Sequence, residues 1–187
     1  MPQNHTDQLA LSIALTAKTR QICLGLESGA ADILELVTPT TAELLLWWFG
    51  DDMVMARGGT ISAGATPGGL NFHVGQKQAI LNVIVAHEVL GQDRATWSLL
   101  DLYRAAAPAA LLSGTRLNEV AQDKHAHPKY CFKMATGTGK TWVLQALLIW
   151  QMLNKTAALA AGQDDARFTR QFMVVAPGLI VYERLLD

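Results

Sequence analysis

One stretch of the sequence decides the fold of this chain: CFKMATGTGKT, residues 131–141. Gly137 and Gly139 stand where a tight loop needs dihedral freedom and a close approach of the backbone to a ligand. An apolar run precedes the loop, and the residues from Trp142 to about Leu159 have the alanine and leucine content of a helix. The stretch therefore predicts a strand, a glycine-rich loop and a helix, with loop amides directed at anionic oxygens.

The residues that end this loop suit a nucleoside triphosphate with its metal ion. The ammonium group of Lys140 would reach the β and γ phosphates, and the hydroxyl of Thr141 would bind Mg²⁺. The N-terminus of the following helix carries a partial positive charge, which also attracts the phosphates. Met134 occupies the first glycine position of the general pattern GxxxxGK[ST]. The strand and helix predicted on either side nevertheless favour ATP binding over a chance glycine-rich turn.

The chain beyond this helix continues the same alternation of elements. Residues 172–176 are a continuous apolar run typical of a buried parallel strand, and Pro177 interrupts it. Leu179–Asp187 predicts a further helix. The order from residue 130 onward is therefore strand, loop, helix, strand, helix. It predicts an α/β fold, namely an incomplete P-loop NTPase (RecA-like) domain.

A second glycine-rich stretch, residues 50–69, divides the chain into two predicted segments. Residues 1–69 are predicted to form a mainly helical N-terminal extension that ends in this stretch. Within it, Thr40 predicts the N-cap of a buried helical run over residues 44–49. Residues 70–187 form the first part of the RecA-like domain, with an insertion at about 91–128.

Three motifs resemble those of superfamily-two helicases, in particular the Res subunit of type III restriction enzymes. They are MATGTGKT at residues 134–141, HVGQKQAI at residues 73–80 and VVAPGLIVYERL at residues 174–185. The resemblance implies that Gln76, with Gln78 as a rival, pairs with adenine through a side-chain amide that offers one donor and one acceptor. It also implies that the corner after the second strand faces a nucleic-acid backbone.

The same resemblance implies a set of ligands and partners. ATP and Mg²⁺ would bind at the loop, the substrate would be double-stranded DNA, and the partner would be a methyltransferase (Mod-type) subunit. The residues predicted to bind the nucleotide are Thr136, Gly137, Thr138, Gly139, Lys140, Thr141 and Gln76, of which Thr141 also binds the metal ion. Those predicted to contact nucleic acid are Pro177, Gly178 and Arg184.

The acidic residues that hydrolysis needs are not found in this sequence. Phosphoryl transfer to water requires an acidic residue at the end of a neighbouring strand. Asp164 and Asp165 lie in a polar loop ahead of a predicted strand instead. We therefore expect an N-terminal fragment that binds ATP and is inactive alone. Two alternatives stay open: a fragment of an RNA or repair helicase, and a non-catalytic interaction module with a vestigial P-loop.

The composition excludes several other classes of protein. The 187 residues carry 15 basic and 16 acidic side chains, for a net charge of −1, which excludes a general basic surface for nucleic acid. Cys23 and Cys131 form no CxxC pair, so neither a disulfide framework nor a zinc ribbon is predicted. The apolar runs are too short for a transmembrane helix. We expect a cytoplasmic protein.

Overall fold

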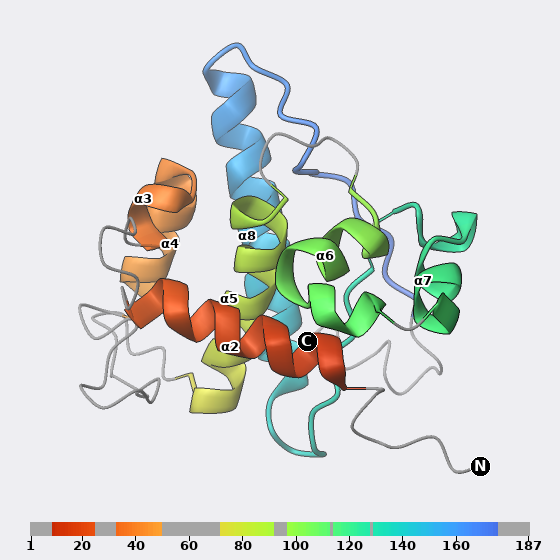
Figure 1. Ribbon diagram of the computed structural model, residues 1–187. Helices are drawn as coiled ribbons and strands as arrows, with labels where there is room; N and C mark the ends of the chain where they lie inside the picture. The colour runs from red at the N-terminus through yellow and green to blue at the C-terminus, as the bar shows by residue number, and fades with distance from the viewer. Residues whose placement is uncertain are drawn as a thin grey trace.

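The computed structural model describes residues 9–24, 33–49, 72–91, 97–112, 114–127 and 129–175. These residues are mainly helical (Figure 1). The α-helices are α2 (Ala10–Leu24), α3 (Ile33–Leu36), α4 (Pro39–Phe49), α5 (Val74–Ile84), α6 (Leu99–Ala106), α7 (Gly114–Val120) and α8 (Lys140–Ala160). The shorter elements are the π-helix η1 (Val85–Val89) and the 3-10 helices η2 (Pro108–Leu111) and η3 (Asp123–His125).

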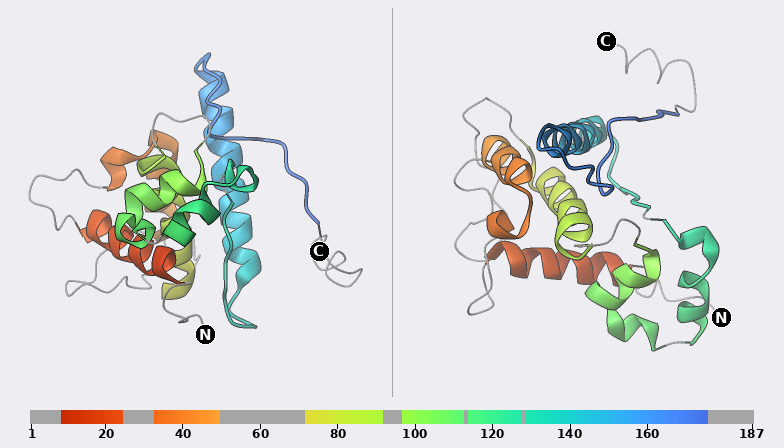
Figure 2. Two further views of the ribbon diagram at one scale, coloured as in Figure 1. Left: turned by 45° about the vertical axis from the view of Figure 1, so that its right-hand side comes forward. Right: turned by 90° about the horizontal axis from the view of Figure 1, so that it is seen from above.

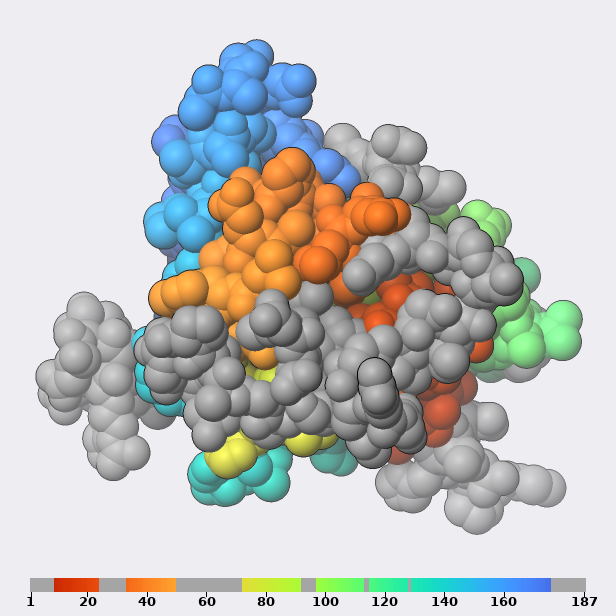
Figure 3. All heavy atoms as spheres, turned by 90° about the vertical axis from the view of Figure 1, so that its left-hand side faces the viewer, coloured from red at the N-terminus to blue at the C-terminus, as the bar shows by residue number. Residues whose placement is uncertain are grey.

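Helices α5 and α8 form the centre of the molecule. Helix α8 packs against α4 and α5, and α2 packs against α5 and α6. Seen from above, α4, α5 and α8 lie close together while α2 runs across one end of α5 (Figure 2). The space-filling view shows α4, in orange, in contact with α8, in blue (Figure 3). Elements from the start and the end of the chain therefore surround α5.

One apolar core joins residues from both sides of the predicted boundary at residue 69. Phe49 in α4 and Phe72, just before α5, meet with ring centroids 5.5 Å apart at an interplanar angle of 86°. Burying an aromatic or aliphatic side chain of this size stabilises a fold by about 1.5–3 kcal/mol. The core also contains Cys23, Ile33, Leu45, Trp48, Ile80, Leu81, Ile84, Val143, Leu147 and Trp150.

The α/β part of the fold prediction is not confirmed, because no strand is assigned among the described residues. Residues 130–134 alternate between the core and solvent as a strand would, and Tyr130, Phe132 and Met134 pack on the core. The sequence predicts a buried strand over residues 172–176, but Met173 is 87% exposed, and residue 176 lies outside the described residues. A sheet requires a ladder of hydrogen bonds to a neighbouring strand. The described part of the chain supplies no such neighbour.

Helix α8 is bounded by two glycines with left-handed backbone. Gly139, its N-cap, has φ 71°, and Gly162 has φ 74° just beyond its last turn. The N–H of Gly162 donates to Leu159 O at 3.0 Å, and the N–H of Gln163 donates to Ala158 O at 2.9 Å. This paired closure is the Schellman motif, which glycine accommodates at little steric cost. The sequence therefore sets both ends of the longest helix.

The N-cap of α4 is Thr38, so the prediction of Thr40 is wrong. Thr38 Oγ1 accepts a hydrogen bond from the N–H of Thr41 at 3.1 Å. Pro39 occupies the first helical position, where a missing N–H is tolerated and the fixed φ suits a helix. Glu43 is exposed. The helix consequently begins at Pro39, before the position that Thr40 as the N-cap predicts.

A buried carboxylate joins three elements that are distant in the sequence. Glu88 in η1 is 1% exposed. It accepts hydrogen bonds from the Thr38 N–H at 2.8 Å, the Thr41 hydroxyl at 2.5 Å and the Trp150 indole N–H at 2.7 Å. Asn154 Nδ2 adds a bond to Thr41 Oγ1 at 2.9 Å. The network ties the start of α4 and the middle of α8 to η1. Removing the acceptor would leave buried donors without a hydrogen bond, which is unfavourable.

The neighbouring His87 connects the segment before the loop to the turn after α8. Its Nε2 lies 2.7 Å from Arg167 O, and its Nδ1 lies 3.2 Å from the Tyr130 hydroxyl. A carbonyl can only accept, so we assign the ring proton to Nε2, and Nδ1 accepts from Tyr130. Burial lowers the pKa of His87 below 6.5, which favours this neutral ring.

The buried carboxylate predicts a pH-dependent stability. Burial raises the pKa of Glu88 above 4.5, against the opposing effect of its three donors. Its protonation therefore contributes stability that is fully present below pH 4.5 and is lost as the pH rises through the folded-state pKa. We expect the free energy of unfolding to fall more steeply over this window in the wild type than in Glu88→Gln. Urea denaturation at a series of pH values measures both, and parallel profiles would contradict the assignment.

Candidate nucleotide-binding site

Residues 135–139 form a tight loop that leads into α8. Gly137 and Gly139 adopt φ values of 80° and 71°. The hydroxyl of Thr138 donates to Ala135 O at 2.7 Å, and its N–H reaches the same oxygen at 3.4 Å. The first N–H groups of α8 have no carbonyl partner within their own helix and lie at its positive end. The loop therefore leads into the positively polarised end of a long helix, which is a type of position where anions bind.

Lys140 places its ammonium group across this loop. Its Nζ lies 3.1 Å from Met134 O and 2.9 Å from Ala135 O, and the side chain is exposed. Both partners are neutral carbonyls. Phosphate oxygens carry full charge and form stronger bonds with an ammonium group. The Lys140 ammonium group already lies beside the loop, so it could exchange these carbonyls for the oxygens of a polyphosphate bound there.

Gln76, predicted to pair with adenine, braces the loop in this structure. Its side chain is buried, and its Oε1 accepts from the His73 N–H at 2.8 Å. Its Nε2 donates to Thr138 O at 3.0 Å and to Gly139 O at 3.3 Å. Both ends of the amide are thus engaged within the protein, and they join the start of α5 to the loop. The structure brings Gln76 to the loop, whereas its role toward adenine stays a prediction.

The other predicted site residues have different surroundings. Thr136 and Thr141 are exposed, and Thr141 lies in the first turn of α8, where its hydroxyl stays the predicted Mg²⁺ ligand. Gln78 bonds through its amide to Arg20 in α2 and to Asn82 in α5. The predicted nucleic-acid contacts lie outside the described residues: Pro177, Gly178 and Arg184.

The carboxylates after α8 are engaged with basic side chains. Asp165 forms an ion pair with Arg167, whose Nη2 lies 2.7 Å from its Oδ2, and this pairing lowers the pKa of Asp165. Asp164 contacts the ammonium group of Lys155. Over the ranges that the structure describes, no cluster of His, Cys, Asp and Glu could hold a metal ion. An Mg²⁺ ion at Thr141 would therefore take most of its ligands from phosphates and water, as this ion commonly does.

Comparison with known families agrees with the motifs. The family described as type III restriction enzyme, res subunit, matches residues 70–187, which include the loop, α5 and α8. This chain belongs to that family. Membership places a helicase-like, ATPase-related domain with the P-loop NTPase fold in residues 70–187. No curated protein and no solved structure matches the chain. Among the described helices of this Res-family chain, none combines the length and the apolar character needed to span a membrane.

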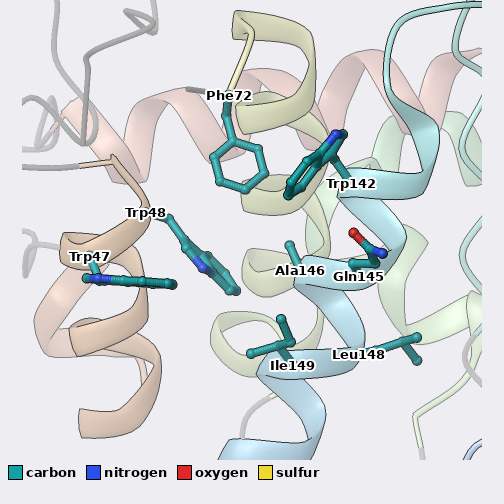
Figure 4. A pocket seen from close by; sticks show the side chains of 8 residues that line it. All are labelled: Trp47, Trp48, Phe72, Trp142, Gln145, Ala146, Leu148 and Ile149. Atoms are coloured by element: carbon teal, nitrogen blue, oxygen red, sulfur yellow. The ribbon is translucent and has the colours of Figure 1, made fainter. Parts of the chain in front are cut away.

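An aromatic pocket beside the loop was not predicted from the sequence. It encloses about 430 Å³ between α4 and the first half of α8. Figure 4 shows the tryptophans of α4 opposite side chains of α8, with Phe72 near one end. The sequence signals were the Trp47–Trp48 pair and a tryptophan directly after the loop. Its lining includes Trp47, Trp48, Phe72, Trp142, Gln145 and Ile149.

The packing of the loop against α5 predicts a strong effect of Gly139→Ala in this Res-family chain. A Cβ at position 139 would lie 2.3 Å from Gln76 Nε2, and the backbone would keep its unfavourable φ of 71°. We expect a loss of about 1–2 kcal/mol in the free energy of unfolding. Gly75→Ala is the matched control, because nothing lies within 4 Å of that position. As a helix substitution it should gain about 0.5–1 kcal/mol. Chemical denaturation measures both, and equal effects would contradict the contact.

Proposed function

We propose that this chain binds ATP with Mg²⁺ through residues 135–141 and serves as the nucleotide-binding part of a DNA-dependent translocase. The observation that carries the proposal is the position of the Lys140 ammonium group at the loop, at the N-terminus of α8. A helix N-terminus, a glycine loop and the cation of a long lysine side chain together match the negative charge of a polyphosphate. Family membership supports the same function.

Each loop residue has a separate role in this proposal. Gly137 and Gly139 let the backbone follow the phosphates without steric conflict. Lys140 neutralises the terminal phosphates, and the Thr141 hydroxyl binds Mg²⁺. Thr136 and Thr138 belong to the turn that the phosphates would contact, and the Thr138 hydroxyl holds this turn through Ala135 O. Gln76 holds the carbonyls of residues 138 and 139, which fixes the direction of the loop as it enters α8.

We propose further that residues 1–187 do not hydrolyse ATP rapidly without additional groups. Phosphoryl transfer needs an acid that orients the attacking water near Mg²⁺. Glu88 is buried and accepts three hydrogen bonds, so it is committed to the core. Asp164 and Asp165 contact basic side chains in the turn after α8. These contacts support a site that binds the nucleotide and requires a further acid for turnover.

The proposed substrate track is double-stranded DNA, and the proposed partner is a methyltransferase (Mod-type) subunit. Both follow from the kinship with type III Res subunits. The contact residues proposed for the DNA backbone are Pro177, Gly178 and Arg184. A loop that joins a strand to a helix offers amides at the helix N-terminus, and such amides bind phosphate without reading the base sequence.

Nucleotide binding predicts a stabilisation that depends on Lys140. At a hundredfold excess over its dissociation constant, ATP with Mg²⁺ should stabilise the chain by about 2.7 kcal/mol. Lys140→Ala should remove this effect, since it deletes the group that meets the terminal phosphates. Lys133→Ala is the control, because Lys133 is an exposed lysine shortly before the loop. Thermal denaturation with and without ligand gives the result. An absent shift in the wild type would favour an interaction module with a vestigial loop.

The internal contacts of three carboxylates predict slow turnover. The chain at saturating ATP and Mg²⁺ should release phosphate no faster than its Lys140→Ala variant, because Glu88, Asp164 and Asp165 are held by donors and basic side chains of the protein and do not orient water. A phosphate-release assay compares the two proteins. ATP-dependent stabilisation is measured first on the same preparations, so that ATP binding is known before turnover is compared. Rapid release by the wild type alone would refute the assignment of Glu88, Asp164 and Asp165 as non-catalytic.

A further inference from the structure

A second pocket lies between α2, α5, α6 and residues 129–134. It encloses about 430 Å³, which falls within the range of small-molecule sites. Helix α2 crosses α5, its first turns lie beside α6, and it contacts both helices (Figure 1). Helix α2 also precedes residues 70–187, which match the Res family. One wall of this pocket is therefore supplied by residues outside the family match.

The buried side chains that line this pocket are aliphatic at its centre. Val83 in α5 is 6% exposed and Leu102 in α6 is 7% exposed. Leu11 and Leu15 of α2 also line the pocket and pack on the cluster that contains Leu102. Each CH₂ group of a ligand that leaves water for such a surface strengthens binding by about fourfold. The inner part of the pocket therefore suits a hydrocarbon chain.

Two lysines lie at the solvent side of this pocket. Lys129 and Lys133 line it and are exposed, whereas Tyr130 and Phe132 pack on the core. Neither lysine forms an ion pair within the part of the chain that the structure describes. None of the lining side chains that the structure describes is acidic. The opening consequently carries positive charge and favours an anionic group.

Two side-chain amides in the wall are held in place by α2. Gln78 Nε2 donates to Asn82 Oδ1 at 2.8 Å, and both residues line the pocket. Arg20 Nε donates to Gln78 Oε1 at 3.1 Å, and Asn82 Nδ2 donates to Thr16 Oγ1 at 3.0 Å. An amide nitrogen carries two N–H donors, and these bonds use one on each amide. The second donors can bind an anionic oxygen, which forms stronger hydrogen bonds than a neutral one.

We propose that this pocket binds a small amphipathic carboxylate. The aliphatic body of the ligand lies on Leu15, Val83 and Leu102, and its carboxylate lies at the opening beside the two lysines. A neutral molecule would make no use of the ammonium groups, and a cation would be repelled by them. An inorganic anion would leave the aliphatic surface in contact with water. The proposal is independent of ATP binding at the glycine loop.

Ligands that differ in charge and chain length test the proposal. Octanoate, decanoate, 1-octanol and octylammonium are titrated into the full chain by isothermal titration calorimetry, each at concentrations where it is monomeric. Decanoate should bind about tenfold more tightly than octanoate, because two further CH₂ groups leave water. Octanoate should bind about threefold more tightly than 1-octanol, as expected for exposed ion pairs, and octylammonium should bind more weakly than both.

Two variants locate the ligand in this pocket. The double variant Lys129→Gln, Lys133→Gln should lower the octanoate affinity to that of 1-octanol and leave the 1-octanol affinity unchanged. Ser12→Phe should abolish decanoate binding, because Ser12 is an exposed lining residue of α2 and a phenyl ring there would fill the space. Ile13→Phe is the matched control, since Ile13 is the next residue of α2, is 58% exposed and does not line the pocket. Circular dichroism verifies that each variant retains its helices.

Several results would overturn the proposal. Equal affinities for octanoate and decanoate would mean that the hydrocarbon chain is not buried. Equal affinities for octanoate and 1-octanol would mean that the lysines do not select a carboxylate. Unchanged decanoate binding by Ser12→Phe, or no decanoate binding by the wild type, would remove the ligand from this pocket. ATP with Mg²⁺ should leave the decanoate affinity unchanged, and displacement by ATP would assign the carboxylate to the glycine loop instead.

Discussion

The structure depends on the hydrogen bonds that the Glu88 carboxylate accepts from Thr38, Thr41 and Trp150. A buried carboxylate is unfavourable unless donors surround it, so its position dictates where the donors must lie. The start of α4 and the middle of α8 are thereby held against η1. The wide π-helical turn of η1, closed by a bond from the Leu90 N–H to Val85 O at 2.8 Å, carries this carboxylate at the end of α5. Local packing alone would not specify this arrangement.

Placement of α8 has two consequences for function. Its N-terminus brings Lys140 to the loop, while the next residues form one wall of the aromatic pocket. Since α4 supplies the opposite wall, residues on both sides of the glycine-rich segment line this pocket. The same helix thus has the Lys140 ammonium group at its first turn and apolar side chains along the face toward α4. Gln76 keeps these two parts in register by holding the carbonyls at residues 138 and 139.

Sequence reasoning succeeded where a residue type has one local use. Gly137 and Gly139, predicted for a tight loop, adopt left-handed backbone that is unfavourable for other residues, and α8 follows them as predicted. It failed for the N-cap of α4, because Thr38 and Thr40 are both threonines and only the position of Pro39 and the acceptor at Glu88 select between them. Residues 130–134 alternate as a strand should, yet strand formation depends on a neighbour that no local pattern supplies. The amide of Gln76 has the donor and acceptor that adenine requires, which is why the sequence predicted this pairing. In the structure its partners are backbone groups of His73 and of residues 138 and 139, because α5 lies close to the loop.

The sequence by itself determined the glycine loop at residues 135–139, the long helix after it and the family to which residues 70–187 belong, because these follow from residue types at fixed spacing. The tertiary structure alone decided which side chains are available to a ligand. Trp47 and Trp142 are 95 positions apart in the numbering (142 − 47) and line one pocket only because α4 packs on α8. Glutamines at positions 76 and 145 are chemically identical in the sequence, and only burial and hydrogen bonding distinguish the one that braces the loop from the one that faces open space. Availability is a property of the folded surroundings, which a linear pattern does not contain.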